Sequence, residues 1–113
     1  MERTGPKVEF LWWEGCPSSD DALALLREEM TALGLDPRSV EVRELRTDGD
    51  AERHGFVGSP TIRIDGVDVQ APGDEPVGLT CRVYRLRDGR ISAVPDREDV
   101  RETLIDAIEG GGD

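Results

Sequence analysis

The sequence is short of basic residues, of cysteine and histidine, and of long apolar segments. It has 14 Lys and Arg residues against 25 Asp and Glu, and its formal net charge is -11. Because a chain this acidic is repelled by nucleic-acid phosphates and by anionic lipid surfaces, we expect neither a nucleic acid nor a membrane as its partner. The apolar run Phe10–Trp13 is far shorter than the roughly 20 residues that a membrane-spanning helix needs.

Two cysteines and one histidine leave few residues for metal or redox chemistry. Residues 1–7 lack the apolar stretch of a signal peptide, which predicts a cytoplasmic protein. In a reducing compartment two cysteines are more typically free, catalytic or redox-active than joined in a structural disulfide. The separations of Cys16, His54 and Cys81 match no zinc-binding pattern, so we expect no metal and no cofactor.

The length predicts one domain over residues 1–113, because neither a repeat nor an interdomain linker interrupts the chain. Residues 1–6 and 110–113 are expected to be flexible. Alternating apolar residues predict strands, and apolar residues three or four apart predict helices. The expected strands cover residues 7–13, 40–45, 61–64 and 67–69, with further extended segments at 81–86 and 90–94, and the expected helices cover residues 16–33, 48–54 and 97–109.

This order of elements predicts an α/β fold, β-α-β-α-β-β-(β)-α, with a central mixed sheet. The first two strands are joined by a helical crossover and should run parallel. Asp65-Gly66, between the third and fourth strands, is a typical hairpin turn. If the third strand runs antiparallel beside the first, Pro60 comes to lie next to Cys16.

Cys16 lies where the first strand ends and the first helix begins. At a helix start, amide N–H groups and the helix dipole favour the thiolate, which is the reactive form of cysteine. Pro17 is favoured at the first helical position and fixes the helix start. A cis peptide bond before Pro60 would leave the backbone of Ser59 free to pair with an incoming extended chain. We therefore expect a reactive thiol at Cys16.

Three short segments resemble the thioredoxin superfamily, in particular small bacterial members that are labelled alkylmercury-lyase-like. They are Trp12–Ser19, which contains Gly-Cys-Pro, Gly58–Ile62, which contains Gly-Ser-Pro-Thr, and Gly78–Arg82, which reads Gly-Leu-Thr-Cys-Arg. The resemblance implies a thioredoxin-like three-layer sandwich, with Cys16 as the nucleophile and Pro60 as a cis proline beside it.

Ser19 departs from this pattern, because a dithiol member of the superfamily would have a second cysteine there. A hydroxyl can hydrogen-bond a thiolate or cap the helix, but it cannot resolve a mixed disulfide. Resolution then falls to Cys81 or to an external thiol. The loop 70–80 should lie at the Cys16 end of the sheet, which permits a Cys16–Cys81 disulfide without requiring one. Substrate would dock beside Cys16 against Trp13, Pro17, Ser59, Pro60 and Thr61.

Three functions remain open on this sequence. The first is a thiol redox protein that exchanges with a protein disulfide or a low-molecular-weight thiol. The second is a soft-metal or organomercurial binder with two thiolate ligands. The third is a binding module that keeps the fold without catalysis. Arg82, Arg85 and Arg87 are expected on an exposed edge strand, where charge discourages aggregation.

Overall fold

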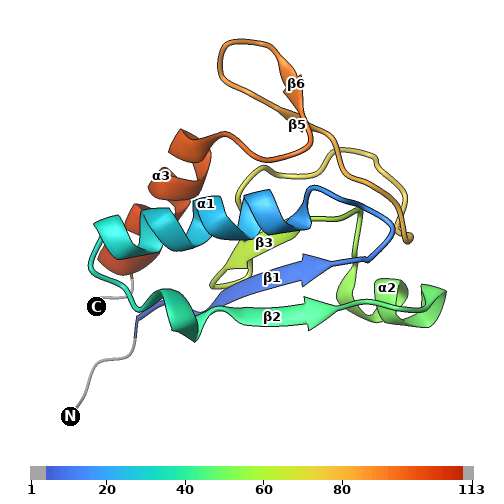
Figure 1. Ribbon diagram of the computed structural model, residues 1–113, viewed down its shortest axis with the longest axis horizontal. Helices are drawn as coiled ribbons and strands as arrows, with labels where there is room; N and C mark the ends of the chain where they lie inside the picture. Colours follow the sequence, from blue (N-terminus) through green and yellow to red (C-terminus); the bar gives the residue numbers. More distant parts are fainter. Residues whose placement is uncertain (1–4, 111–113) are drawn as a thin grey trace.

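A four-stranded mixed sheet in the order β2-β1-β3-β4 forms the centre of the computed structural model, which describes residues 5–110 (Figure 1). Its strands are β1 Val8–Trp12, β2 Glu41–Glu44, β3 Thr61–Ile64 and β4 Val67–Asp68. The other elements are helices α1 Ser19–Ala32, α2 Asp48–His54 and α3 Arg97–Gly110, the 3₁₀ helix η1 Pro37–Ser39, and the strands β5 Tyr84–Arg85 and β6 Ile91–Ser92. The predicted α/β class and mixed sheet are confirmed. The flexibility expected at the two ends falls mainly on residues 1–4 and 111–113, which lie outside the described residues.

The central strand β1 determines where the functional segments meet. It pairs in parallel with β2 and antiparallel with β3, as predicted. In the antiparallel register Leu11 faces Thr61, so the end of β1 adjoins the start of β3. The predicted hairpin turn is present, since Asp65 and Gly66 both have positive φ, 52° and 82°. The segment after β1 and the segment before β3 therefore reach the same end of the sheet.

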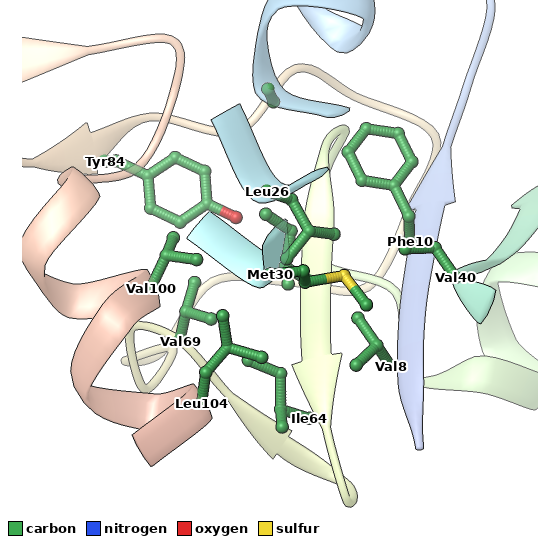
Figure 2. Close-up of a cluster of buried hydrophobic side chains, with 12 residues drawn as sticks. Val8, Phe10, Leu26, Met30, Val40, Ile64, Val69, Tyr84, Val100 and Leu104 are labelled. Atoms are coloured by element: carbon green, nitrogen blue, oxygen red, sulfur yellow. The ribbon is translucent and has the colours of Figure 1, made fainter. Parts of the chain in front are cut away.

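The larger core lies between one face of the sheet and the helices α1 and α3. Figure 2 shows Leu26 and Met30 of α1 between the side chains of α3 and those of β1. The fully buried members of this core include Val8, Phe10, Ala22, Leu26, Met30, Ile62, Ile64, Tyr84, Val100 and Leu104. Each of the valine, leucine, isoleucine, phenylalanine and methionine side chains among them contributes about 2 kcal/mol when it is removed from water. This core fixes α1, and with it the helix start that follows Cys16.

A smaller core lies on the opposite face of the sheet. Leu11 of β1 packs there with Leu45, Phe56 and Ala51 of α2. β5 and β6 do not extend the central sheet but pair with each other in a second, two-stranded sheet. Within residues 5–110 none of the helices is both long enough and apolar enough to cross a membrane.

An ion-pair cluster joins α1 to α3, with a buried carboxylate on α1 and two half-exposed arginines on α3. The Glu29 side chain is only 3% exposed, a burial that the apolar pattern of α1 does not predict. It is tolerated because Arg97 and Arg101 of α3 reach its carboxylate at 2.6 and 2.7 Å. The pKa of Glu29 is lowered, first by the hydrogen bond from Arg101.

Replacing Glu29 with Gln should lower the free energy of unfolding at neutral pH by about 2 kcal/mol, because charge-assisted hydrogen bonds are lost. Since the folded-state pKa is lowered, this contribution is present above the ordinary pKa of the carboxyl. It is lost as the pH falls through the lowered value. Urea unfolding of wild type and Glu29→Gln from neutral to acidic pH should show the two curves converging.

Glu28→Gln is the matched control. Glu28 bonds Arg97 at 2.9 Å, but its side chain is 63% exposed. An exposed ion pair of this kind contributes about 0.5 kcal/mol. A loss as large as that of Glu29→Gln would contradict a special role for the buried carboxylate.

Candidate functional site

Three segments distant in sequence meet at the end of β1 that leads to Cys16. They are the turn at residues 13–18, the residues just before β3, and residues 80–82, which we call the covering segment. The Ser59 amide donates to the Thr80 carbonyl at 2.8 Å, and the Ser59 carbonyl accepts from the Arg82 amide at 2.9 Å. Ser59 and Cys81 thereby form a parallel bridge. The Ser59–Pro60 peptide bond is cis, as the resemblance implies.

The expectation that the Ser59 backbone is free for an incoming chain is wrong. Both of its hydrogen-bonding groups are already used by the covering segment. Sequence reasoning correctly expected loop 70–80 and Cys81 near Cys16. It missed the pairing, because an isolated bridge of this kind has no repeating pattern of residues that would reveal it.

The Cys16 sulfur lies at the start of α1 but is largely covered. The residue is 5% exposed, and its sulfur lies 3.4 Å from the Ser59 carbonyl oxygen and 3.7 Å from the Ser18 hydroxyl. Because α1 begins only at Ser19, the hydrogen bonds of residues 5–110 include none from a helix amide to this sulfur. The predicted position is confirmed, whereas the predicted amide contacts are replaced by a carbonyl and a hydroxyl.

Of the two serines that follow Pro17, the one beside the Cys16 sulfur is not the predicted one. Ser19 does not contact the sulfur; its hydroxyl lies 3.2 Å from the Ser59 hydroxyl and 3.5 Å from the Cys16 carbonyl. The hydroxyl next to the sulfur belongs to Ser18, which sequence reasoning overlooked. Ser18 is the residue before α1, yet its side chain caps no helix amide and is available to the sulfur.

Cys81 presents a free thiol beside that of Cys16. Neither cysteine is in a disulfide, and Cys81 is exposed whereas Cys16 is buried. The Cys81 sulfur lies 4.0 Å from the Gly15 carbonyl oxygen. A hydrogen bond with the Cys16 sulfur, followed by burial and by the charge of Cys16, raises the pKa of Cys81 to about 11. Cys81 therefore keeps its proton at neutral pH and can donate it to the sulfur of Cys16.

Cys16→Ala should bring the pKa of Cys81 down from about 11 toward the ordinary range, because the largest cause of the increase is removed. The rate of alkylation of Cys81 as a function of pH, followed by peptide mass, measures this change. Ser18→Ala is the control, since it removes a contact of Cys16 and leaves the Cys16 sulfur in place. An unchanged Cys81 profile in Cys16→Ala would show that the two thiols do not interact.

Arg82 anchors the covering segment to β4. Its side chain is 5% exposed, bonds Asp68 of β4 at 2.8 Å and stacks 4.4 Å from the centre of the Tyr84 ring. Its guanidinium also donates to the Gln70 carbonyl and to the Thr61 hydroxyl. The expected exposed position of Arg82 is wrong, because the acidic partner on β4 is not visible in the sequence.

Gly58 lets the covering segment approach the cis peptide bond. Its φ is +140°, which favours glycine, and a Cβ there would lie 2.8 Å from the Arg82 Cβ and 3.0 Å from the Arg82 amide nitrogen. A side chain at this position would push the two segments apart.

The other predicted substrate contacts are divided between surface and interior. Ser59, Pro60 and Thr61 are buried, and the Thr61 hydroxyl donates to the Gly58 carbonyl at 2.6 Å. Pro17 is exposed and Trp13 half-buried. The Trp13 amide donates to the Ser59 hydroxyl at 3.0 Å, so the turn after β1 is tied to the cis peptide bond.

A groove of about 550 Å³ opens next to Trp13. It is lined by Trp12, Trp13, Glu14, Glu44, Leu45 and Arg46. A larger hollow of about 780 Å³ lies at the opposite end of β1 and contains none of the predicted site residues.

Arg82→Met should lower the free energy of unfolding by about 3 kcal/mol, because it leaves the nearly buried Asp68 carboxylate without its partner. The matched control is Arg85→Met three residues further on, at an exposed position, which should change stability by less than about 0.5 kcal/mol. Urea unfolding of both variants checks this, and equal losses would mean that Arg82 is not an anchor.

Comparisons of the chain with protein-family models, with curated proteins and with solved structures found no match. Within residues 5–110 no group of three or more His, Cys, Asp or Glu side chains is placed to hold a metal ion. The site itself contains two unbridged thiols beside a cis Ser59–Pro60 peptide bond.

Proposed function

We propose that the protein is a thiol–disulfide redox protein with a thioredoxin-like fold, in which Cys16 is the nucleophile and Cys81 resolves the mixed disulfide. The observation that carries the proposal is the pair of free thiols, one buried and one exposed, next to the cis Ser59–Pro60 peptide bond. The helix α1, which starts three residues after Cys16, and the strand order β2-β1-β3-β4 also favour it.

In the first step Cys16 attacks a disulfide. Cys81 keeps its proton at neutral pH and is a hydrogen-bond donor to the Cys16 sulfur, so Cys16 is the member of the pair that we assign as the nucleophile. The Cys16 thiolate attacks one sulfur of R–S–S–R, forms Cys16–S–S–R and releases R–S⁻. The Ser18 hydroxyl, 3.7 Å from the Cys16 sulfur, is the second group that can donate to the thiolate.

In the second step Cys81 resolves the mixed disulfide. Its proton passes to the released R–S⁻. The Cys81 thiolate then attacks the Cys16 sulfur, breaks the bond to R, and releases a second R–S⁻ that takes a proton from solvent. The mixed disulfide has removed the charge and the acceptor that raise the pKa of Cys81, so this pKa falls when its thiolate is needed. Overall two protein thiols are oxidised to a disulfide and R–S–S–R is reduced to two thiols.

A second candidate, binding of a soft metal ion, is favoured by the same adjacency. Two neighbouring thiolates are a suitable ligand pair for a soft cation such as mercuric ion. Such binding would need both cysteines and no change in their oxidation state.

Cys81→Ser distinguishes the two steps of the redox reaction. When the reduced variant is mixed with 2-hydroxyethyl disulfide and quenched with acid, a mixed disulfide on Cys16 should accumulate, because the resolving thiol is absent. Wild type should instead pass to a form that is lighter by two hydrogens. Intact-protein mass spectrometry measures both products.

Cys16→Ser is the matched control: it can form neither the internal disulfide nor an adduct on Cys16, and any adduct on the exposed Cys81, located by peptide mass, should form more slowly than the Cys16 adduct of Cys81→Ser. A wild-type protein that stays a dithiol with every disulfide would contradict the redox proposal. If that protein also bound mercuric ion, and each single variant lost the binding, the second candidate would be supported instead.

A further inference from the structure

We infer that the Cys16–Cys81 pair exchanges with low-molecular-weight disulfides and thiols that carry an amine, and not with extended polypeptide strands. The inference rests on the proposed redox function, since it names the substrate class of the same site. Three observations carry it: the occupied backbone of Ser59, the anchored covering segment, and the aromatic, acidic groove beside Cys81.

The backbone that would align a polypeptide substrate is already occupied. An extended chain binds at a strand edge through backbone hydrogen bonds, which need a free N–H and a free C=O on the protein. At Ser59 both groups are bonded, at 2.8 Å to Thr80 and at 2.9 Å to Arg82. A polypeptide would have to displace the covering segment before it could pair there.

Displacing the covering segment means breaking a buried polar cluster. The Arg82 guanidinium is held by Asp68, by the Gln70 carbonyl and by the Tyr84 ring. The segment also lies in direct contact with Gly58. A small disulfide avoids this cost, because it needs no backbone pairing and can approach the covered Cys16 sulfur from the side of the exposed Cys81 while the covering segment stays in place.

The groove at Trp13 contains neither cysteine, but Gly15 lies between its Trp13 wall and the Cys81 sulfur. A Cβ at Gly15 would collide with the Trp13 ring, so this ring lies directly against the glycine. The Gly15 carbonyl in turn faces the Cys81 sulfur at 4.0 Å. The groove has a volume of about 550 Å³ and is open to solvent, so it can contact one group of a small ligand without enclosing the whole of it. A substrate attached at the thiols therefore has the groove next to it.

The charge of the groove selects the class of substrate. Arg46 is paired with Glu44 at 2.9 Å, so this pair contributes no net charge. Within residues 5–110 no ion pair neutralises Glu14, which leaves the groove with one negative charge next to Trp13. An indole ring and a carboxylate together attract an ammonium group. Asp20, in the first turn of α1, adds to the negative potential near Cys16 and repels anionic disulfides.

The reduced wild-type protein should be oxidised by cystamine about tenfold faster than by oxidised glutathione at low ionic strength. The neutral 2-hydroxyethyl disulfide should fall between them. Each rate is divided by the rate at which the same disulfide oxidises dithiothreitol, which corrects for the reactivity of the reagent. Added salt should narrow the ratio, because it screens the attraction and the repulsion.

A disulfide-linked dimer of a short extended peptide, with the same net charge as cystamine, tests the exclusion of polypeptides. It should oxidise the pair about tenfold more slowly than cystamine after the same correction, because the Ser59 backbone is occupied. Intact mass, followed over time, gives both rates.

Glu14→Gln tests the groove, with Glu109→Gln as its matched control. Both substitutions remove one negative charge, but Glu109 lies on α3 at the opposite end of the molecule. Glu14→Gln should lower the rate with cystamine about threefold and leave the neutral disulfide unchanged, whereas Glu109→Gln should alter neither.

The outcomes separate this inference from the function on which it rests. If no disulfide oxidises the pair, the redox function itself fails. If the pair is oxidised but the peptide dimer or oxidised glutathione reacts as fast as cystamine, the inferred substrate class is wrong while the redox function stands. Equal effects of Glu14→Gln and Glu109→Gln would overturn the assignment of the groove.

Discussion

The pairing between Ser59 and the covering segment is the constraint on which the candidate site depends. Two backbone hydrogen bonds at Ser59 place Cys81 near Cys16, at the N-terminal end of α1. Without them the loop after β4 has no regular pairing of its own, since residues 70–80 form neither a helix nor a strand. The position of the second thiol is thus set by a bridge of one residue pair, and everything proposed for the two cysteines follows from it.

Among the residues that the structure describes, two charged side chains are buried, Glu29 and Arg82, and each of them holds two segments together. Arg82 joins the covering segment to β4 through Asp68, and Glu29 joins α1 to α3 through Arg97 and Arg101. In both places the desolvated ion has a partner, as its burial requires. Such a pair contributes less free energy than an apolar contact of the same size. It does specify which segments meet, and the contact that Arg82 specifies is the one beside the thiols.

Most of the secondary structure was predictable because it depends on local patterns. The helix at residues 48–54 has the predicted bounds, with Gly55 at φ +57° directly after it, and the hairpin at Asp65-Gly66 is where the turn residues place it. The meeting of Cys16 and Cys81 was partly predictable, from strand directions and the course of the loop. The buried position of Arg82 was not, because it depends on Asp68, which becomes its neighbour only through the pairing of β3 with β4. The position of Ser18 beside the Cys16 sulfur was missed for a different, local reason. Helix-start patterns leave the first helical residue uncertain by one or two positions.

The two cysteines are far apart in sequence, so a disulfide between them would change the stability of the whole domain. A Cys16–Cys81 bond would close a ring of about 65 residues that contains three strands of the central sheet, β2, β3 and β4. A ring of that size restricts the unfolded chain by about 4 kcal/mol. A disulfide between residues three apart in a single motif would restrict it far less. The redox state of this pair would therefore set not only the chemistry at one end of β1 but also the resistance of the whole domain to heat and to proteolysis.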